Sequence, residues 1–301
     1  MDRQRTQRTR MKKIGVIGLG NMGRGMAFSL QRGGYEVVGY DALEATRTDL
    51  RQKGLHCVDA IAALAGTVDM VVLSLPTSDI VEQVVLGEGG LLQCGTDGLV
   101  IVDTTTADPN STRRLAAELQ AAGMQLVDAP VSGGPKGAAT ATMGMVIGGS
   151  AEIVARIEPV LAVMSAKRVH VGPVGAGHVA KLLNNLVTGT HLLIAGEAAR
   201  VAAAAGLDAR QIFQGLAAGS ANSKVIDTFY PTWIFNEAFD SGFTMKLMRK
   251  DLRLAMNLIE QTESTTPLAK EAGRLWARSV ERLADAEDFN RIVTYIDPSE
   301  H

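Results

Sequence analysis

The sequence predicts an α/β protein with an N-terminal Rossmann-type doubly wound sheet, followed by an all-α domain that begins with a long interdomain helix. Two observations lead to this fold class. Up to residue 171, short apolar runs alternate with helical patterns, which is typical of a parallel sheet covered by helices. After the glycine-rich segment 172–177 the patterns are helical, so we place the domain boundary near residue 174.

Seven apolar runs of strand length lie before this boundary, and five helical patterns lie between them. The predicted strands are 14–17, 36–40, 70–73, 99–102, 125–127, 145–147 and 168–171. The predicted helices are 22–33, 43–53, 78–86, 109–122 and 152–164. The fourth helix begins with a proline, which suits a first turn because its missing N–H costs no hydrogen bond there.

A helical pattern of about 28 residues, from 178 to 205, opens the second half and corresponds to a helix of roughly 42 Å. This pattern is apolar around most of its circumference, so one layer of helices is not enough to cover it. We therefore expect part of it to be buried against a second subunit in a homodimer or homotetramer. Further helices are predicted at 209–216, 245–261, 267–279 and 286–293.

The composition describes a globular protein without an obvious charged partner. The 30 basic and 32 acidic residues give a formal net charge of −2, so we expect no nucleic-acid partner and no membrane surface as a partner. Ionisable side chains interrupt the apolar stretch 182–205, which argues against a membrane span. Cys57 and Cys94 form neither a metal-spaced pair nor a disulfide framework, which favours the cytoplasm. The five histidines are scattered, so we expect no metal site.

Residues 1–11 differ in composition from the chain that follows, with four arginines and no apolar run. We expect a disordered tail here. A nucleic-acid-binding arm or an organelle signal is the alternative, which the shortness of the stretch disfavours. The predicted organisation is therefore a dinucleotide-binding domain over 12–174 and an all-helical substrate and dimerisation domain over 175–301.

A glycine turn follows the first predicted strand directly and opens a helix. In such a turn the first glycine allows the tight bend, the second lets a pyrophosphate approach, and the third lets helix and strand pack closely. The free N–H groups at the helix start then bind the phosphates. Asp41 ends the next strand, where a carboxylate bonds the ribose hydroxyls and repels a 2′-phosphate, so we predict NAD rather than NADP. The turn consists of Gly18, Leu19, Gly20, Asn21, Met22 and Gly23.

Two further strand ends are candidates for the same site. Leu75 and Pro76 end one strand at the carboxyl edge, where ligands bind in doubly wound sheets. Thr104, Thr105 and Thr106 end the next strand. Their hydroxyls either face the cofactor or cap the helix that follows, and the sequence leaves both possibilities open.

The loop 128–134 contains a serine followed by two glycines, Ser132, Gly133 and Gly134. Backbone N–H groups in such a segment can point at an anion, and the hydroxyl adds a further donor. We predict that these residues bind an anion. A purely structural bend is the alternative.

Lys181 is the isolated permanent charge between residues 179 and 195, inside the long predicted helix. Desolvation lowers the pKa of a lysine, which would make it a proton shuttle near neutral pH. Asn185 lies four residues further, on the same helix face, and can hold the group that Lys181 protonates. The alternative is a lysine whose ammonium reaches water. His178 lies on the same face and is expected to be a packing residue.

These motifs together resemble the β-hydroxyacid dehydrogenase family, which includes 3-hydroxyisobutyrate dehydrogenases and tartronate semialdehyde reductases. Four segments carry the resemblance, at 18–23, 128–134, 181–185 and 250–252, and it covers roughly residues 12–297. Ala141 departs from the pattern, because relatives usually carry a glycine there.

The resemblance implies a role for each matching residue. Lys181 is implied to be the catalytic acid/base, and Asn185 orients it or the substrate. Ser132, Gly133 and Gly134 are implied to bind the substrate carboxylate. Lys250 is implied to lie by the nicotinamide, although a salt-linked surface pair with Asp251 is the alternative, and Leu75, Pro76 and Thr106 match cofactor-contacting positions.

The implied function is NAD-dependent oxidation of the alcohol of a small, carboxylate-bearing 3-hydroxy acid similar to 3-hydroxyisobutyrate, by hydride transfer with a lysine acid/base. A reductase of tartronate or succinic semialdehyde is one alternative, and a dehydrogenase of the L-serine or threonate type is another. A non-catalytic NAD sensor is disfavoured. Hydroxymethylglutarate is also a possible substrate.

Overall fold

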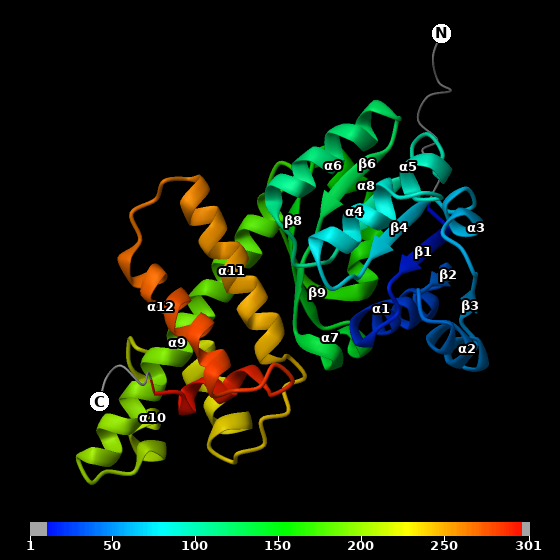
Figure 1. Ribbon diagram of the computed structural model, residues 1–301. Helices are drawn as coiled ribbons and strands as arrows, with labels where there is room; N and C mark the ends of the chain where they lie inside the picture. The colour runs from blue at the N-terminus through cyan, green and yellow to red at the C-terminus, as the bar shows by residue number, and fades with distance from the viewer. Residues whose placement is uncertain (1–10, 297–301) are drawn as a thin grey trace. The chain divides into compact units, whose positions relative to one another are not determined.

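The computed structural model describes residues 11–296, and the chain divides into two compact units after Lys181 (Figure 1). The predicted tail falls mostly on residues 1–10, which lie outside the described residues, so it stays a prediction. The division falls inside a helix that begins at Ala176, beyond the predicted boundary at 174. Each unit has its own hydrophobic core.

A nine-stranded sheet forms the centre of the first unit. Its strands are β1 (Lys13–Ile17), β2 (Glu36–Tyr40), β3 (His56–Cys57), β4 (Met70–Leu73), β5 (Val100–Asp103), β6 (Gln125–Asp128), β7 (Val131–Ser132), β8 (Met143–Gly148) and β9 (Ser165–Gly172). Their order is β3-β2-β1-β4-β5-β6-β8-β7, with β9 paired to β8. The strands from β3 to β6 are parallel, and the winding direction changes between β1 and β4, where doubly wound sheets bind their ligands.

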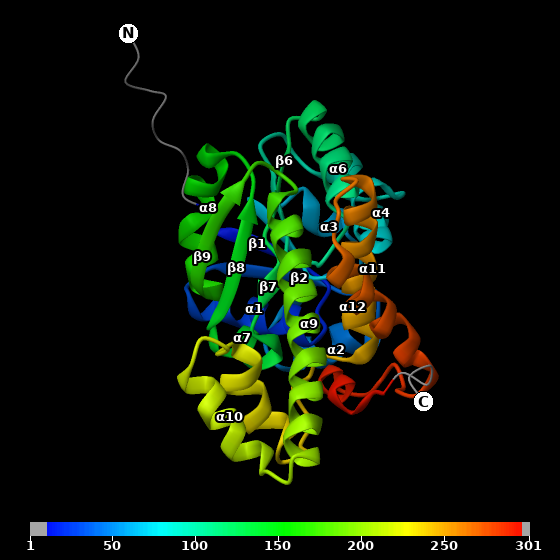
Figure 2. The same ribbon diagram turned by 90° about the vertical axis from the view of Figure 1, so that its left-hand side faces the viewer.

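β8 departs from the parallel sheet that the sequence predicts, because it runs antiparallel to both β6 and β7. β9 pairs parallel with β8, and the two lie side by side in Figure 2. The seven predicted strands all form, most of them with shifted ends. β3 and β7 have no predicted counterpart, because two residues are too few for an apolar run to stand out.

Helices connect these strands and follow the predicted alternation. They are α1 (Asn21–Arg32), α2 (Glu44–Gln52), α3 (Ala62–Ala65), α4 (Ser78–Leu86), α5 (Leu91–Cys94), α6 (Pro109–Ala121), α7 (Gly134–Thr140) and α8 (Ala151–Met164). The five longer ones correspond to the predicted helices, whereas α3, α5 and α7 were not predicted. α7 contains two glycines and a proline, which lower helix propensity. It ends at Ala141 with a left-handed φ of 57°, a conformation that costs a non-glycine residue about 1–2 kcal/mol.

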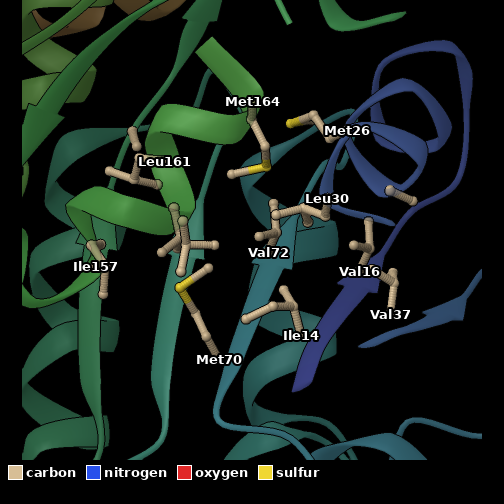
Figure 3. Close-up of a cluster of buried hydrophobic side chains, with 14 of the residues drawn as sticks. Ile14, Val16, Met26, Leu30, Val37, Met70, Val72, Ile157, Leu161 and Met164 are labelled. Carbon is tan, nitrogen blue, oxygen red and sulfur yellow. The ribbon is translucent and has the colours of Figure 1, made fainter. Parts of the chain in front are cut away.

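Successive strand residues point to opposite faces of the sheet, and each face has its own core. On one face, Val16 and Val72 belong to a cluster with side chains of α1 and α8, among them Leu30 and Leu161 (Figure 3). On the other face, Leu73 packs in a second cluster with side chains of α4 and α6. Burial on both faces explains why these strands read as uninterrupted apolar runs.

The long helix α9 (Ala176–Ala204) begins in the first unit and continues as the first element of the second unit. Figure 2 shows it as one unbroken helix, as the sequence predicts. Within residues 11–296, no helix is both long enough and apolar enough to cross a bilayer.

The second unit is otherwise built from helices of several kinds. They are α10 (Ala209–Ala218), the π-helix η1 (Val225–Ile234), α11 (Met245–Gln261), α12 (Pro267–Arg278) and the 3₁₀ helices η2 (Ser279–Glu281) and η3 (Phe289–Thr294). α10, α11 and α12 were predicted, whereas η1 was not. The α-helix predicted at 286–293 is wrong, because a 3₁₀ helix begins there only at Phe289. The Asp288 carboxylate accepts hydrogen bonds from the N–H groups of Ser241 and Asn290, which fixes a non-helical turn before η3.

Trp276 lies at the centre of the second unit and is fully buried. Its indole N–H donates to the backbone oxygen of Gly189, at 3.2 Å. A Cβ at Gly189 would lie 3.0 Å from the indole nitrogen, so the glycine lets α9 approach the tryptophan of α12 closely. This contact ties the two helices by a buried hydrogen bond as well as by packing.

Candidate active site

The three glycines of the turn after β1 have different surroundings. Gly18 has a φ of 87°, and a Cβ there would lie 2.2 Å from the backbone oxygen of Ser74. A Cβ at Gly23 would lie 1.8 Å from the backbone oxygen of Gly18. No described atom lies within 4 Å of the position that a Cβ at Gly20 would take. The first and third glycines are therefore required by packing, whereas the second faces open space, as the approach of a pyrophosphate would need.

The start of α1 is left available to an anion. Gly20 is its N-cap residue, and no side chain among the described residues makes the capping hydrogen bond. The first turn also carries no acidic side chain. The N–H groups of Asn21, Met22 and Gly23 are therefore available to an anion such as the phosphates of a dinucleotide.

Asp41 lies directly beside this turn. One carboxylate oxygen accepts the Leu19 N–H at 2.7 Å, and the other accepts the Leu43 N–H at 2.9 Å. Each oxygen retains a lone pair for a ribose hydroxyl. Arg47 pairs with Asp59 at 3.2 Å and donates to the backbone oxygen of Asp41, and Arg51 shares the same Asp59 carboxylate. The Asp41 carboxylate favours a ribose with a free 2′-hydroxyl, because it repels a 2′-phosphate.

The ends of β4 and β5 are tied together by threonine hydroxyls. The Leu75 N–H donates to Thr105 Oγ1 at 3.2 Å, and Thr104 Oγ1 donates to the backbone oxygen of Leu73 at 2.6 Å. The helix that follows is capped instead by Asp108, whose side chain accepts the Asn110 N–H. Of the two possibilities that the sequence leaves open, helix capping therefore does not apply to the hydroxyls of Thr104 and Thr105. Thr106 is half-buried in the same connection, and Pro76 is exposed next to Leu75.

Ser132 and Lys181 come from distant parts of the first unit and meet. Ser132 ends β7, and the Lys181 ammonium on α9 donates to its hydroxyl at 3.0 Å. Only 8 % of Lys181 is exposed. Gly133 and Gly134 follow with φ values of 125° and 61°, which explains why glycines occupy both positions. The Lys181 amine and the Ser132 hydroxyl, which precedes a two-glycine backbone segment, therefore lie within hydrogen-bond distance.

His178 is fully buried one turn before Lys181, with more polar contacts than a packing residue needs. Its Nδ1 lies 2.8 Å from Thr112 Oγ1, and its Nε2 lies 3.8 Å from a carboxylate oxygen of Asp103. Burial raises the pKa of Asp103, and the nearby His178 partly opposes this rise. Asp103 has no role predicted from the sequence, because its position at a strand end is the only signal that it carries.

Asn185 and Lys250 lie in the second unit, where both contact Asp251. The Asn185 amide donates to one carboxylate oxygen of Asp251 at 2.6 Å, and the Lys250 ammonium lies 3.0 Å from the other. The Asn184 amide also donates to the side-chain oxygen of Asn185, at 3.0 Å. Asp251 is buried, so the Lys250–Asp251 pair does not lie at the surface. Asp251 has no site role predicted from the sequence, although its position beside Lys250 is an available signal.

Two family models match the chain and together cover nearly all of it. The model described as "NAD binding domain of 6-phosphogluconate dehydrogenase" matches residues 13–172. The model described as "NAD-binding of NADP-dependent 3-hydroxyisobutyrate dehydrogenase" matches residues 175–296.

Individual proteins match over nearly their full lengths. The chain is 33 % identical over 281 residues to the 2-(hydroxymethyl)glutarate dehydrogenase of Eubacterium barkeri, covering 93 % of each chain. It is 31 % identical over 297 residues to the NAD-dependent L-serine dehydrogenase of Pseudomonas aeruginosa, covering 96 % of this chain and 99 % of that protein. The solved structure of Mycobacterium tuberculosis 3-hydroxyisobutyrate dehydrogenase with L-serine has a TM-score of 0.88 and 32 % identity, covering 94 % of this chain and 98 % of that one.

Proposed function

The chain belongs to the β-hydroxyacid dehydrogenase family, and on that premise we propose that it oxidises the primary alcohol of a small 3-hydroxy acid with NAD. It is an NAD-binding oxidoreductase that acts on CH–OH groups, as predicted. The observation that carries the proposal is the buried Lys181 amine, 3.0 Å from the Ser132 hydroxyl.

The names of the relatives support one substrate class. 2-(Hydroxymethyl)glutarate, L-serine and 3-hydroxyisobutyrate all carry a hydroxymethyl group on the carbon that bears a carboxylate. Such a molecule presents an anion two bonds from the alcohol carbon. A carboxylate site beside an acid/base suits this arrangement, so we assign this shared fragment as the recognised part of the substrate.

The chain's own residues then bind the substrate and move its proton. Ser132, Gly133 and Gly134 hold the carboxylate with hydroxyl and backbone N–H donors. Lys181, as a neutral amine, takes the proton of the substrate hydroxyl, and in the reverse direction its ammonium returns that proton. Asn185 follows one turn later on the same helix and orients the hydroxyl. NAD, when bound, accepts the hydride.

The cofactor site is assigned on the same grounds. Gly18, Leu19, Gly20, Asn21, Met22 and Gly23 hold the pyrophosphate, and Asp41 holds the adenosine ribose. Leu75, Pro76 and Thr106 contact the cofactor at the strand ends, and Lys250 lies beside the nicotinamide. We assign the dinucleotide-binding domain to residues 12–174 and the helical substrate and dimerisation domain to 175–301, which the junction of the two family models between 172 and 175 supports.

A substrate panel tests this function by following NADH absorbance. The panel contains 3-hydroxyisobutyrate, L-serine, 2-(hydroxymethyl)glutarate and threonate, each with NAD and with NADP. We expect turnover with at least one hydroxymethyl acid and a preference for NAD. The control 2-methyl-1-propanol replaces the carboxylate of 3-hydroxyisobutyrate by a methyl group, and its kcat/KM is expected to be at least about 10²-fold lower.

Other outcomes of the panel lead to other functions. Turnover only with tartronate or succinic semialdehyde and NADH would identify a reductase. NAD binding without turnover of any alcohol or aldehyde would refute the enzyme and leave a sensor.

We also propose that the protein is a homodimer or homotetramer. α9 exposes four large apolar side chains along its length, with 45 % of Leu183, 52 % of Val187, 57 % of Ile194 and 68 % of Val201 accessible. Their spacing of four and seven residues aligns them in one stripe, which a second subunit would cover. Analytical ultracentrifugation at micromolar concentration tests this, and a monomer there contradicts it.

We also propose that the protein is located in the cytoplasm. Cys57 and Cys94 are both free thiols, which supports this location, and cell fractionation would test it.

A further inference from the structure

We propose that Asp128 is a positioning residue, whose carboxylate holds the first turn of α9 so that Lys181 stays beside Ser132. This inference rests on the proposed function, since it assigns Asp128 a role through the Lys181 amine. Asp128, Ser132, the start of α9 and Lys181 all lie in the first unit.

Asp128 ends β6 and is completely buried. One carboxylate oxygen accepts the Gly175 N–H at 2.7 Å, and the other accepts the His178 N–H at 2.8 Å. Both N–H groups belong to the start of α9, where a helix has no backbone acceptor of its own for them. A carboxylate is also the favoured charge at this end of a helix dipole. Asp128, the first residue of the loop 128–134, therefore caps the helix that carries Lys181.

Two glycines leave the space that Asp128 occupies. A Cβ at Gly148 would lie 2.5 Å from one of its oxygens, and a Cβ at Gly177 would lie 2.7 Å from the backbone oxygen of Asp128. Side chains at these positions would displace either β8 or the helix start. The close approach of Asp128 to the first turn of α9 therefore depends on glycine at both positions.

This cap and the proposed catalytic contact join the same two segments. Ser132 lies four residues after Asp128, and Lys181 lies three residues after His178, which is about one helical turn. The Lys181–Ser132 hydrogen bond closes a ring with the Asp128–His178 hydrogen bond. Because the lysine stem is flexible, fixing its helix turn limits the positions that its amine can reach.

The His178 imidazole holds the same turn from a second direction. Its contacts with Thr112 on α6 and with Asp103 at the end of β5 connect the helix start to two further elements. The backbone N–H of His178 goes to Asp128 while its ring goes to α6 and β5. This turn is therefore held on both sides, which is what placing an amine for proton transfer requires.

The test compares Asp128→Asn in two backgrounds. The amide keeps the shape but presents an NH₂ group to one of the two N–H donors, so we expect kcat to fall about 10²-fold, as for a misplaced catalytic group. In the Lys181→Ala background the same substitution should lower the unfolding temperature equally but leave the residual kcat unchanged. An equal fold-loss of kcat in both backgrounds would overturn the proposal, because Asp128 would then act independently of Lys181.

Two further measurements separate positioning from loss of folded protein. The deuterium isotope effect on kcat, with substrate labelled at the alcohol carbon, should rise in Asp128→Asn, whereas a smaller folded fraction would leave it unchanged. Asp208→Asn is the matched control, since Asp208 caps α10 by accepting the Arg210 N–H at 2.9 Å. It makes the same chemical change at a helix start and should leave both kcat and the isotope effect at wild-type values.

A second variant covers the case in which Asp128→Asn does not fold. Gly177→Ala leaves the carboxylate intact and pushes the helix turn away from Asp128, so kcat should fall at least about tenfold with the KM for NAD unchanged. A wild-type kcat in this variant would contradict the positioning role. Full activity of Lys181→Ala would instead contradict the acid/base role of Lys181, and a wild-type protein that turns over no hydroxymethyl acid would contradict the proposed function itself, so these failures are distinguishable.

Discussion

Replacing Lys181 by alanine is expected to lower kcat about 10²–10⁴-fold while NAD binds as tightly as before. The amine donates to Ser132 at 3.0 Å and is buried, so its removal takes away the proposed proton acceptor. The glycine turn and Asp41, which we propose hold the cofactor, belong to other segments of the chain: Asp41 accepts the Leu19 N–H, whereas Lys181 donates to Ser132. Steady-state kinetics at saturating substrate, together with an NAD titration by fluorescence, measure both quantities.

Two control variants narrow the interpretation of that result. Lys136→Ala removes an exposed lysine of α7 close to the same loop in sequence, and we expect its kcat to stay at the wild-type value. Lys181→Arg keeps a positive charge that does not deprotonate at neutral pH, so it should remain inactive. Turnover near the wild-type rate in Lys181→Ala would remove the acid/base assignment, and activity in Lys181→Arg would favour charge stabilisation over proton transfer.

The glycine turn leads to a second prediction of large effect, in which two similar substitutions act differently. Gly20 has a φ of −62° and open space around its Cβ position, so Gly20→Ala should fold with wild-type stability. Its methyl group would occupy the place of the pyrophosphate, and we expect NAD affinity to fall roughly 10²-fold, or about 2.8 kcal/mol. Calorimetric titration with NAD and thermal unfolding without NAD separate the two effects.

Gly23→Ala should show the opposite pattern, with a loss of stability before any loss of affinity. Its Cβ would lie 1.8 Å from the backbone oxygen of Gly18, so the turn must move, at a cost of about 1–3 kcal/mol or more in the free energy of unfolding. If Gly20→Ala binds NAD normally, or if Gly23→Ala unfolds at the wild-type temperature, the roles assigned to the three glycines are wrong.

Most of the fold could be predicted, because strands that are buried on both faces, such as β4 and β5, appear in the sequence as apolar runs. The predicted family, fold class and NAD cofactor are confirmed. The failures occur where local sequence carries little information. α7 was not predicted, because it begins with a glycine and a proline. The α-helix expected at 286–293 does not form, because hydrogen bonds to the Asp288 side chain fix a non-helical turn there. The antiparallel direction of β8 is decided by pairing, which apolar periodicity does not reveal.

Residues of the candidate site could be named from the sequence where they belong to a motif. Residues whose role depends on contacts between distant segments could not. Lys181 and Ser132 were both singled out, and they lie within hydrogen-bond distance. Asp103, Asp128 and Asp251 received no role, because their contacts with His178, with the α9 backbone and with Asn185 become visible only after folding. The individual roles of the site residues stay predictions.

The two backbone hydrogen bonds of Asp41 have a consequence for redesign of this enzyme. A substitution meant to admit a phosphorylated ribose would also remove the acceptors of the Leu19 and Leu43 N–H groups. Selectivity and the shape of the phosphate-binding turn are therefore coupled through one side chain. An engineered switch to NADP would have to supply new acceptors for both amides along with the new positive charge.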